Sequence, residues 1–180
     1  MYLRENRYAT VTEKINEYLE SHRKDLDGIY ISGGEPLMHE GVVSFLQYAK
    51  TLNYKIKIHT NGMFYERLKT ILAQKLVDHV SLDIKNAPSA YAKTCGVEDM
   101  DLKDIEKSLD LLKQSVVPYD ICVTLVDELH NQATIEELGE WIQGVDTVIL
   151  QPFEDRETTI DHSLHRPSFK VVLKYKKIFE

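Results

Sequence analysis

The chain has 180 residues, 43% of them hydrophobic and 28% charged, and this composition fits a single globular domain over residues 1–180. Its net charge of −7 argues against nucleic-acid binding, which needs a positive surface. No apolar run reaches the roughly 18 residues of a membrane span, and the charged N-terminus lacks a signal-peptide core, so we expect a cytoplasmic protein without membrane contact.

Short β-branched runs alternate with amphipathic segments along the chain. The runs predict strands at residues 28–32, 55–60, 79–84, 119–126 and 147–150. Apolar residues at helical spacing predict helices before, between and after them, the last at 169–179. Thr10 and Thr134, each followed three residues later by glutamate, indicate two helix starts. This alternation predicts an α/β fold with a mostly parallel sheet, because parallel neighbours need crossover helices.

Polar residues follow each predicted strand at its carboxyl end. They form the segments Ser32-Gly33-Gly34-Glu35-Pro36, His59-Thr60-Asn61-Gly62, Asp83-Ile84-Lys85, the region of Thr124, and Gln151-Pro152-Phe153. The carboxyl ends of parallel strands meet at one rim, where α/β proteins bind their ligands. The sequence therefore predicts a binding site at this rim.

The residue types at the rim suggest an amino-acid-like ligand. Gly33 and Gly34 let the backbone approach closely, and their carbonyls with Glu35 suit a cationic amine. Lys85 suits a carboxylate, and Asn61 can bind hydroxyls or amides. Each element also has a simpler interpretation: Asn61-Gly62 as a turn, Asp83 and Lys85 as a solvated ion pair, and His59 as a core histidine.

These segments, in this order, resemble the radical S-adenosylmethionine (SAM) enzymes, and more narrowly the activating enzymes of glycyl-radical proteins, such as the anaerobic ribonucleotide reductase activating type. The resemblance rests on residues 26–37, 59–62, 80–88 and 150–153. It implies a partial (β/α)6 barrel of the TIM-like kind. It also implies a SAM site made by Gly33, Gly34, Glu35, Pro36, Thr60, Asn61, Asp83, Lys85 and Thr124.

The family's chemistry implies further cofactors and partners. A [4Fe-4S] cluster cleaves SAM reductively, and the 5′-deoxyadenosyl radical takes a hydrogen atom from a glycyl-radical enzyme such as anaerobic ribonucleotide reductase or pyruvate formate-lyase. A flavodoxin- or ferredoxin-type protein would supply the electron. Two alternatives remain: a radical SAM enzyme acting on a small molecule, as in 7-carboxy-7-deazaguanine synthase, or a ligand-binding module without catalysis.

The chain departs from the family at the cluster motif. The family holds its cluster with three cysteines spaced C-x3-C-x2-C, whereas this chain contains only Cys95 and Cys122. The chain also opens on a predicted helix rather than on a strand. We therefore expect a truncated barrel that lacks its first strand, contains no catalytic or metal-binding residue and is inactive alone.

Overall fold

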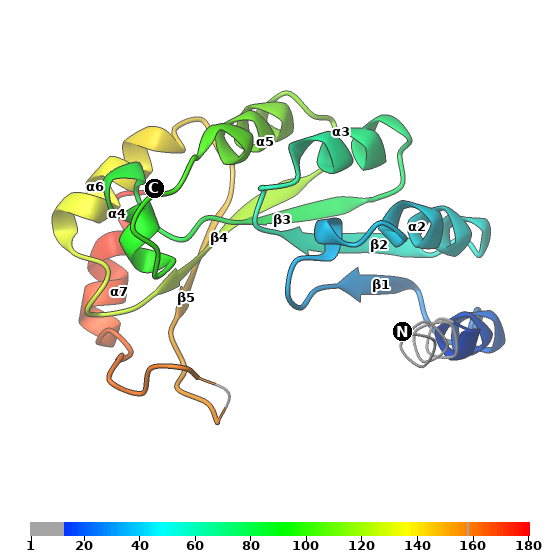
Figure 1. Cartoon of the computed structure of the whole chain (residues 1–180), viewed down its shortest axis with the longest axis horizontal. Helices are drawn as coiled ribbons and strands as arrows, with labels where there is room; N and C mark the ends of the chain where they lie inside the picture. The colour runs from blue at the N-terminus through cyan, green and yellow to red at the C-terminus, as the bar shows by residue number, and fades with distance from the viewer. Residues whose placement is uncertain (1–12, 158) are drawn as a thin grey trace.

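The strands form one parallel sheet in the computed structural model, which describes residues 13–157 and 159–180 (Figure 1). They are β1 (Gly28–Ile31), β2 (Lys55–Thr60), β3 (His79–Asp83), β4 (Tyr119–Leu125) and β5 (Val148–Pro152). They lie in sequence order, and every neighbouring pair is parallel. Among the described residues β1 and β5 do not pair with each other, so the sheet is open. The predicted α/β fold, a partial barrel, is confirmed.

The main helices lie on one side of this sheet. They are α2 (Val42–Thr51), α3 (Tyr65–Ala73), α4 (Pro88–Thr94), α5 (Lys103–Lys113), α6 (Gln132–Trp141) and α7 (Phe169–Lys176), with a short 3-10 helix η1 (Pro36–Met38). Residues 13–21 are also helical. Figure 1 shows α2, α3, α5 and α6 following one another around the outside of the curved sheet. Within residues 13–157 and 159–180, no helix is both long and apolar enough to cross a membrane.

The outer face of the sheet, which meets the helices, is apolar. The register sets Ile58 beside Val80 and Leu82 beside Ile121, and all four are completely buried. Burying such a side chain stabilises the fold by about 1.5–3 kcal/mol. The helices complete this core with buried residues that include Leu46, Leu68, Ile71, Leu109, Leu112, Ile135 and Leu138.

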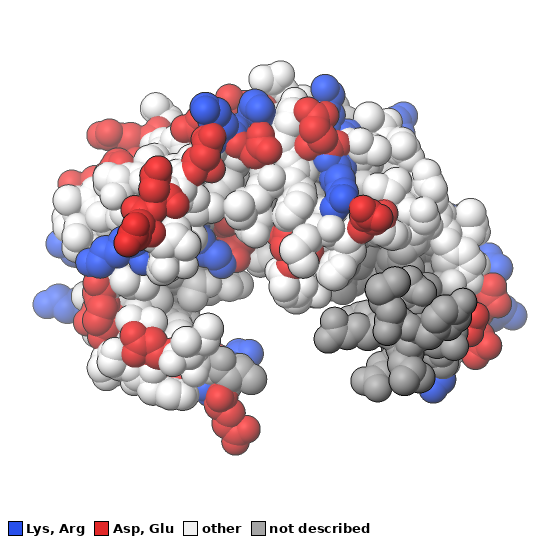
Figure 2. Space-filling model, in the orientation of Figure 1, with Lys and Arg blue, Asp and Glu red and all other residues white. Residues whose placement is uncertain are grey.

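The inner face of the sheet is polar. Side chains alternate along a strand, so the residues between the apolar ones face the concave side. The register places them next to one another in rows across the strands. Figure 2 shows the molecule as an arch with a hollow on its inner side. The polar residues of this inner face are Tyr30, Lys57, His59, His79, Ser81, Asp83, Asp120, Cys122 and Thr124.

The helix α6 begins one turn before its predicted start. Its N-cap is Asn131, whose side chain accepts a hydrogen bond from the Thr134 backbone N–H at 3.1 Å. The Thr134 hydroxyl in turn accepts one from the Asn131 backbone N–H, which completes a capping box. Thr134 is therefore the third helical residue instead of the cap. Glu137 accepts hydrogen bonds from Ser89 in α4.

Other boundaries also differ from the predictions. The strand β5 continues two residues further, through Pro152. The elements η1 and α4 were not predicted, because three and seven residues are too few to show helical periodicity. The helix start predicted at Thr10 lies outside the described residues.

Candidate functional site

The buried carboxylate of Glu35 joins the loops that follow β1 and β2. Its Oε1 accepts hydrogen bonds from the Leu37 backbone N–H (2.9 Å) and the Thr60 hydroxyl (2.8 Å). Its Oε2 accepts one from the Asn61 backbone N–H at 2.7 Å. Hydrogen bonds to an ionised acceptor are among the strongest in proteins. Glu35 therefore fixes the two loops relative to each other, and buried Pro36 starts η1 directly behind it.

The two glycines before Glu35 have backbone carbonyls that receive no backbone hydrogen bond from the described residues. Gly33 has a φ of +95° and Gly34 of +54°, a backbone region that favours glycine. A Cβ added to either glycine would meet no atom within 4 Å. This loop can therefore receive a small cationic group such as an ammonium.

Thr60 and Asn61, at the end of β2, have different roles. Thr60 pairs with Leu82 on the outer face and is 1% exposed, so its side chain supports the loop and does not line the hollow. Asn61 Oδ1 accepts a hydrogen bond from the Met63 backbone N–H at 3.0 Å. The Asn61 side-chain NH2 group has no hydrogen-bond partner in the described part of the chain, which leaves two donors at the rim.

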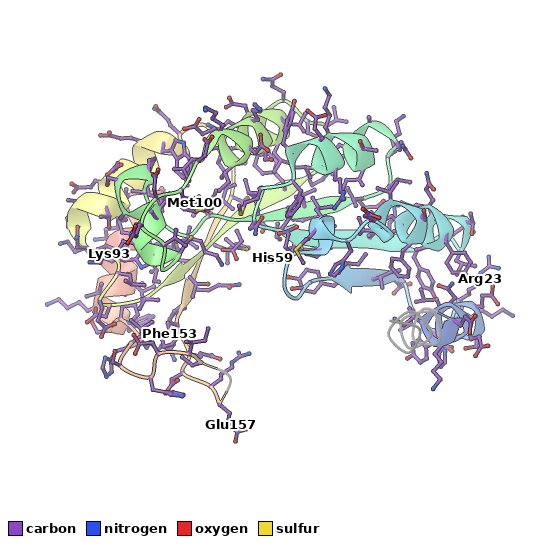
Figure 3. All side chains as sticks on the ribbon, viewed as in Figure 1. Arg23, His59, Lys93, Met100, Phe153 and Glu157 are labelled. Atoms are coloured by element: carbon purple, nitrogen blue, oxygen red, sulfur yellow. The ribbon has the colours of Figure 1, made fainter. Side chains whose placement is uncertain are left out.

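A row of hydrogen-bonded side chains crosses the inner face from β1 to the end of β3. The Tyr30 hydroxyl lies 2.9 Å from His59 Nδ1, and His59 Nε2 lies 3.5 Å from Asp83 Oδ2. The same oxygen accepts a hydrogen bond from Lys85 Nζ at 2.6 Å. Burial alone would raise the pKa of Asp83, but His59 and Lys85 hold it below its ordinary value. Figure 3 labels His59 on the inner side of the sheet.

Lys85 keeps donors free in this row. Its side chain is 40% exposed, and Asp83 is its only ion-pair partner among the described residues. An ammonium group has three N–H donors, so two remain for a ligand. The ion pair predicted as the simpler interpretation is therefore present, and it leaves Lys85 able to bind an anion.

Thr124 lies farther along the rim, in an open groove formed by β4, β5 and the loop that follows β5. It pairs with Gln151 in the register and lines a groove of about 580 Å³ with Pro152, Phe153 and Arg156. Figure 3 labels Phe153 on the loop that follows β5. An aromatic ring next to a hydroxyl and an amide suits a planar ligand with polar edges.

A second polar cluster lies deeper on the inner face, around Asp120. Its Oδ2 lies 3.0 Å from Lys57 Nζ and 2.6 Å from His79 Nε2. Burial would raise the pKa of Asp120, but its hydrogen-bonded neighbours lower it to about 2. Burial and Asp120 together raise the pKa of the Cys122 thiol to about 12. Cys122 therefore stays protonated and is a poor ligand or nucleophile.

The structure brings together part of the predicted set. The glycine loop and Asn61 meet through Glu35, and Lys85 is linked to β2 through Asp83 and His59. His59 is not the core histidine of the simpler interpretation: it lies on the inner face, 22% exposed. Tyr30 was not predicted at all. The alternation of apolar and polar residues along β1 and β2 was the signal that could have placed Tyr30 and His59 on the same face of the sheet.

Comparisons with known proteins agree with this fold. A family model described as the radical SAM superfamily matches residues 2–142. A Methanocaldococcus jannaschii protein, provisionally named a glycyl-radical enzyme activating enzyme, is 31% identical over 135 residues, covering 73% of this chain. The match covers 56% of that protein, so this chain spans about half the length of its curated relative.

Two solved structures share the fold at low sequence identity. A domain of pyruvate-formate lyase-activating enzyme from Bacteroides vulgatus is 18% identical, with a TM-score of 0.68 over 84% of this chain and 92% of that domain. The protein anSMEcpe, solved with bound AdoMet, is 16% identical, with a TM-score of 0.58 over 82% of this chain and 45% of its own.

Proposed function

Because this chain belongs to the radical SAM superfamily, we propose that it forms the SAM-binding part of an activating enzyme for a glycyl-radical protein. The observation that carries this proposal is that one rim of the parallel sheet holds both carbonyls without a backbone donor, at Gly33 and Gly34, and a partly exposed cation, at Lys85. SAM has an ammonium and a carboxylate on the same carbon, so it needs acceptors and donors side by side.

The described residues fit the amino-acid end of SAM. The carbonyls of Gly33 and Gly34 would hold the ammonium, and Lys85 would hold the carboxylate, with the Asn61 amide beside it. Glu35, Pro36 and Thr60 would keep the loop in shape, and Asp83 would orient Lys85. The groove at Thr124 would take the planar adenosine end. In an activating enzyme that supplies an electron, one-electron reduction of bound SAM would release the radical that abstracts a hydrogen atom from the partner.

The residues do not fit an iron–sulfur cluster. Cys122 is buried in β4 with a raised pKa, and exposed Cys95 follows α4. A cluster needs several thiolates around one site, and these two cysteines are the only ones in the sequence. We assign no cluster ligand to this chain and propose that, by itself, it binds SAM without cleaving it.

The protein partners follow from the proposed activity. We propose a glycyl-radical enzyme as substrate, by analogy with the relative's name. We also propose a flavodoxin- or ferredoxin-type protein as reductant, from the resemblance to the family alone. The open hollow on the inner face supports access by a protein loop (Figure 2).

Calorimetry with SAM tests the binding proposal. We expect the chain to bind SAM, and Lys85→Ala to weaken binding by about 10- to 100-fold, since hydrogen bonds to charged groups contribute about 1.5–3 kcal/mol. Lys93→Ala is the matched control, because Lys93 is an exposed lysine in α4 without an ion pair among the described residues. Absence of SAM binding would refute the proposal, and equal affinity of both variants would remove Lys85 from the site.

A further inference from the structure

Buried side chains fasten the loop after β3 to the loop after β4. His130, 4% exposed, has its Nε2 2.9 Å from the Lys85 carbonyl oxygen. Asn86, completely buried, donates from Nδ2 to the Leu129 carbonyl oxygen at 2.8 Å and to the Thr94 hydroxyl at 2.9 Å. An unpaired buried polar group costs free energy of folding, so these two side chains are buried only because each finds a partner in the other loop. The two loops are therefore held in a fixed relative position.

The contacts of His130 define its protonation state. A carbonyl oxygen can only accept, so the hydrogen bond to Lys85 places a proton on Nε2. Nδ1 lies 3.1 Å from both the backbone N–H and the carbonyl oxygen of Val126. In the neutral ring, whose single proton is on Nε2, Nδ1 can only accept, so its partner is the Val126 N–H. Burial lowers the pKa of His130, which favours the same neutral form. The ring therefore connects the Lys85 carbonyl to the Val126 amide in a single orientation.

The Lys85 carbonyl belongs to the residue that would bind the ligand carboxylate. Fixing this peptide group fixes the direction in which the Lys85 side chain leaves the backbone, toward Asp83 Oδ2 at 2.6 Å. The backbone carbonyl of His130 in turn accepts a hydrogen bond from the Tyr175 hydroxyl of α7 at 3.3 Å. His130 is thus held by its ring to the loops after β3 and β4, and by its backbone carbonyl to α7.

We propose that His130 is a positioning residue that aims Lys85 at the carboxylate of the bound ligand. It acts through the Lys85 peptide group and does not itself touch the ligand. The inference rests on the proposed SAM-binding function, but the geometry of the loop can be tested without SAM.

Two substitutions at His130 separate its two hydrogen bonds. In His130→Gln the side-chain amide reaches the position of Nε2 and keeps the donor to Lys85. In His130→Asn the shorter side chain keeps an acceptor near Nδ1 for Val126 and loses the contact with Lys85. Each variant loses one ring hydrogen bond, so we expect similar decreases in melting temperature.

The SAM affinities of the two variants should differ. We expect His130→Gln to bind SAM within about threefold of the unchanged chain, and His130→Asn to bind at least tenfold more weakly. A purely structural role would make affinity follow stability, whichever hydrogen bond is kept. Equal affinities in the two variants would overturn the proposal.

Hydrogen exchange without SAM distinguishes this inference from the proposed function. We expect the amides of Asn86 and Ala87 to exchange faster in His130→Asn than in His130→Gln. If the unchanged chain fails to bind SAM, the proposed function is wrong, and equal exchange in both variants would then refute the positioning role as well.

A second pair of variants applies if His130→Asn does not fold. Asn86→Ala removes the hydrogen bond to Leu129 that joins the two loops, together with those to Thr94 and to the Ala87 backbone N–H. Thr94→Val removes the hydrogen bonds to Asn86 and to the Ala90 carbonyl oxygen and leaves the bond between the two loops in place. We expect only Asn86→Ala to weaken SAM binding by tenfold or more. Equal affinities of these two variants would show that the connection between the two loops does not position Lys85, and this would overturn the proposal.

Discussion

Replacing Glu35 by glutamine should destabilise the chain although it changes only one atom. Both carboxylate oxygens accept hydrogen bonds from backbone N–H groups, of Leu37 at one oxygen and of Asn61 at the other. The amide of glutamine has one oxygen and one NH2 group. In either orientation, therefore, one backbone N–H faces another donor inside a buried site.

The magnitude follows from these contacts. Losing a hydrogen bond to a charged acceptor costs about 1.5–3 kcal/mol, and an unsatisfied buried donor adds about 1 kcal/mol or more. We expect Glu35→Gln to reduce the free energy of unfolding by about 3 kcal/mol. With a urea slope of about 2 kcal/mol per molar, the midpoint should fall by about 1.5 M.

Urea unfolding followed by circular dichroism measures this effect. The control is Glu40→Gln, because Glu40 is exposed and makes no hydrogen bond in the described part of the chain. Its midpoint should stay within about 0.3 M of the unchanged chain, as is usual for surface substitutions. If Glu35→Gln shifts the midpoint no more than Glu40→Gln does, Glu35 does not hold the two loops together.

Three further predictions concern single side chains. Asp120→Asn should lower the free energy of unfolding by about 2 kcal/mol at pH 7, because the folded pKa of Asp120 is about 2 against an ordinary 3.8. This contribution is present above pH 4 and disappears as the pH falls through 2, so the urea midpoints of the two proteins should become equal at that pH. Gly62→Ala should destabilise the chain by roughly 2 kcal/mol in the same assay, because Gly62 has a φ of +78° and a new Cβ would lie 2.8 Å from Leu82 Cδ1; an unchanged midpoint would refute this packing. Glu128 raises the pKa of the exposed His165, so this contact stabilises the fold below the ordinary pKa of 6.5, and the stabilisation is lost as the pH rises. Glu128→Gln should lower the His165 pKa in an NMR titration, and an unaltered pKa would show that the contact does not form.

The strands were predictable because their pattern is local. In β2, buried Ile56 and Ile58 alternate with the polar Lys57 and His59, and this two-residue period is visible in the sequence itself. The position of the binding rim could be predicted from the strands, because the carboxyl ends of parallel strands all lie at the same edge of the sheet. The fold class therefore needed no contact between distant residues.

The details of the site depended on contacts that the sequence does not display. Glu35 and Asn61 are 26 residues apart, and only the loop geometry brings them to 2.7 Å. Thr60 was predicted as a ligand residue, but it takes the buried position on the outer face. His130 lies 45 residues after Lys85 in a segment without an apparent motif, so no pattern in the sequence connects the two.

The order of the strands has a consequence for how this chain acquires its shape. Within residues 13–157 and 159–180, each strand pairs only with strands adjacent to it in sequence, so the sheet can lengthen one strand at a time. During synthesis, β1 and β2 can associate before β4 has left the ribosome, and each later strand can pair with the strand that precedes it in the already formed sheet. Assembly and translation can therefore proceed in the same direction.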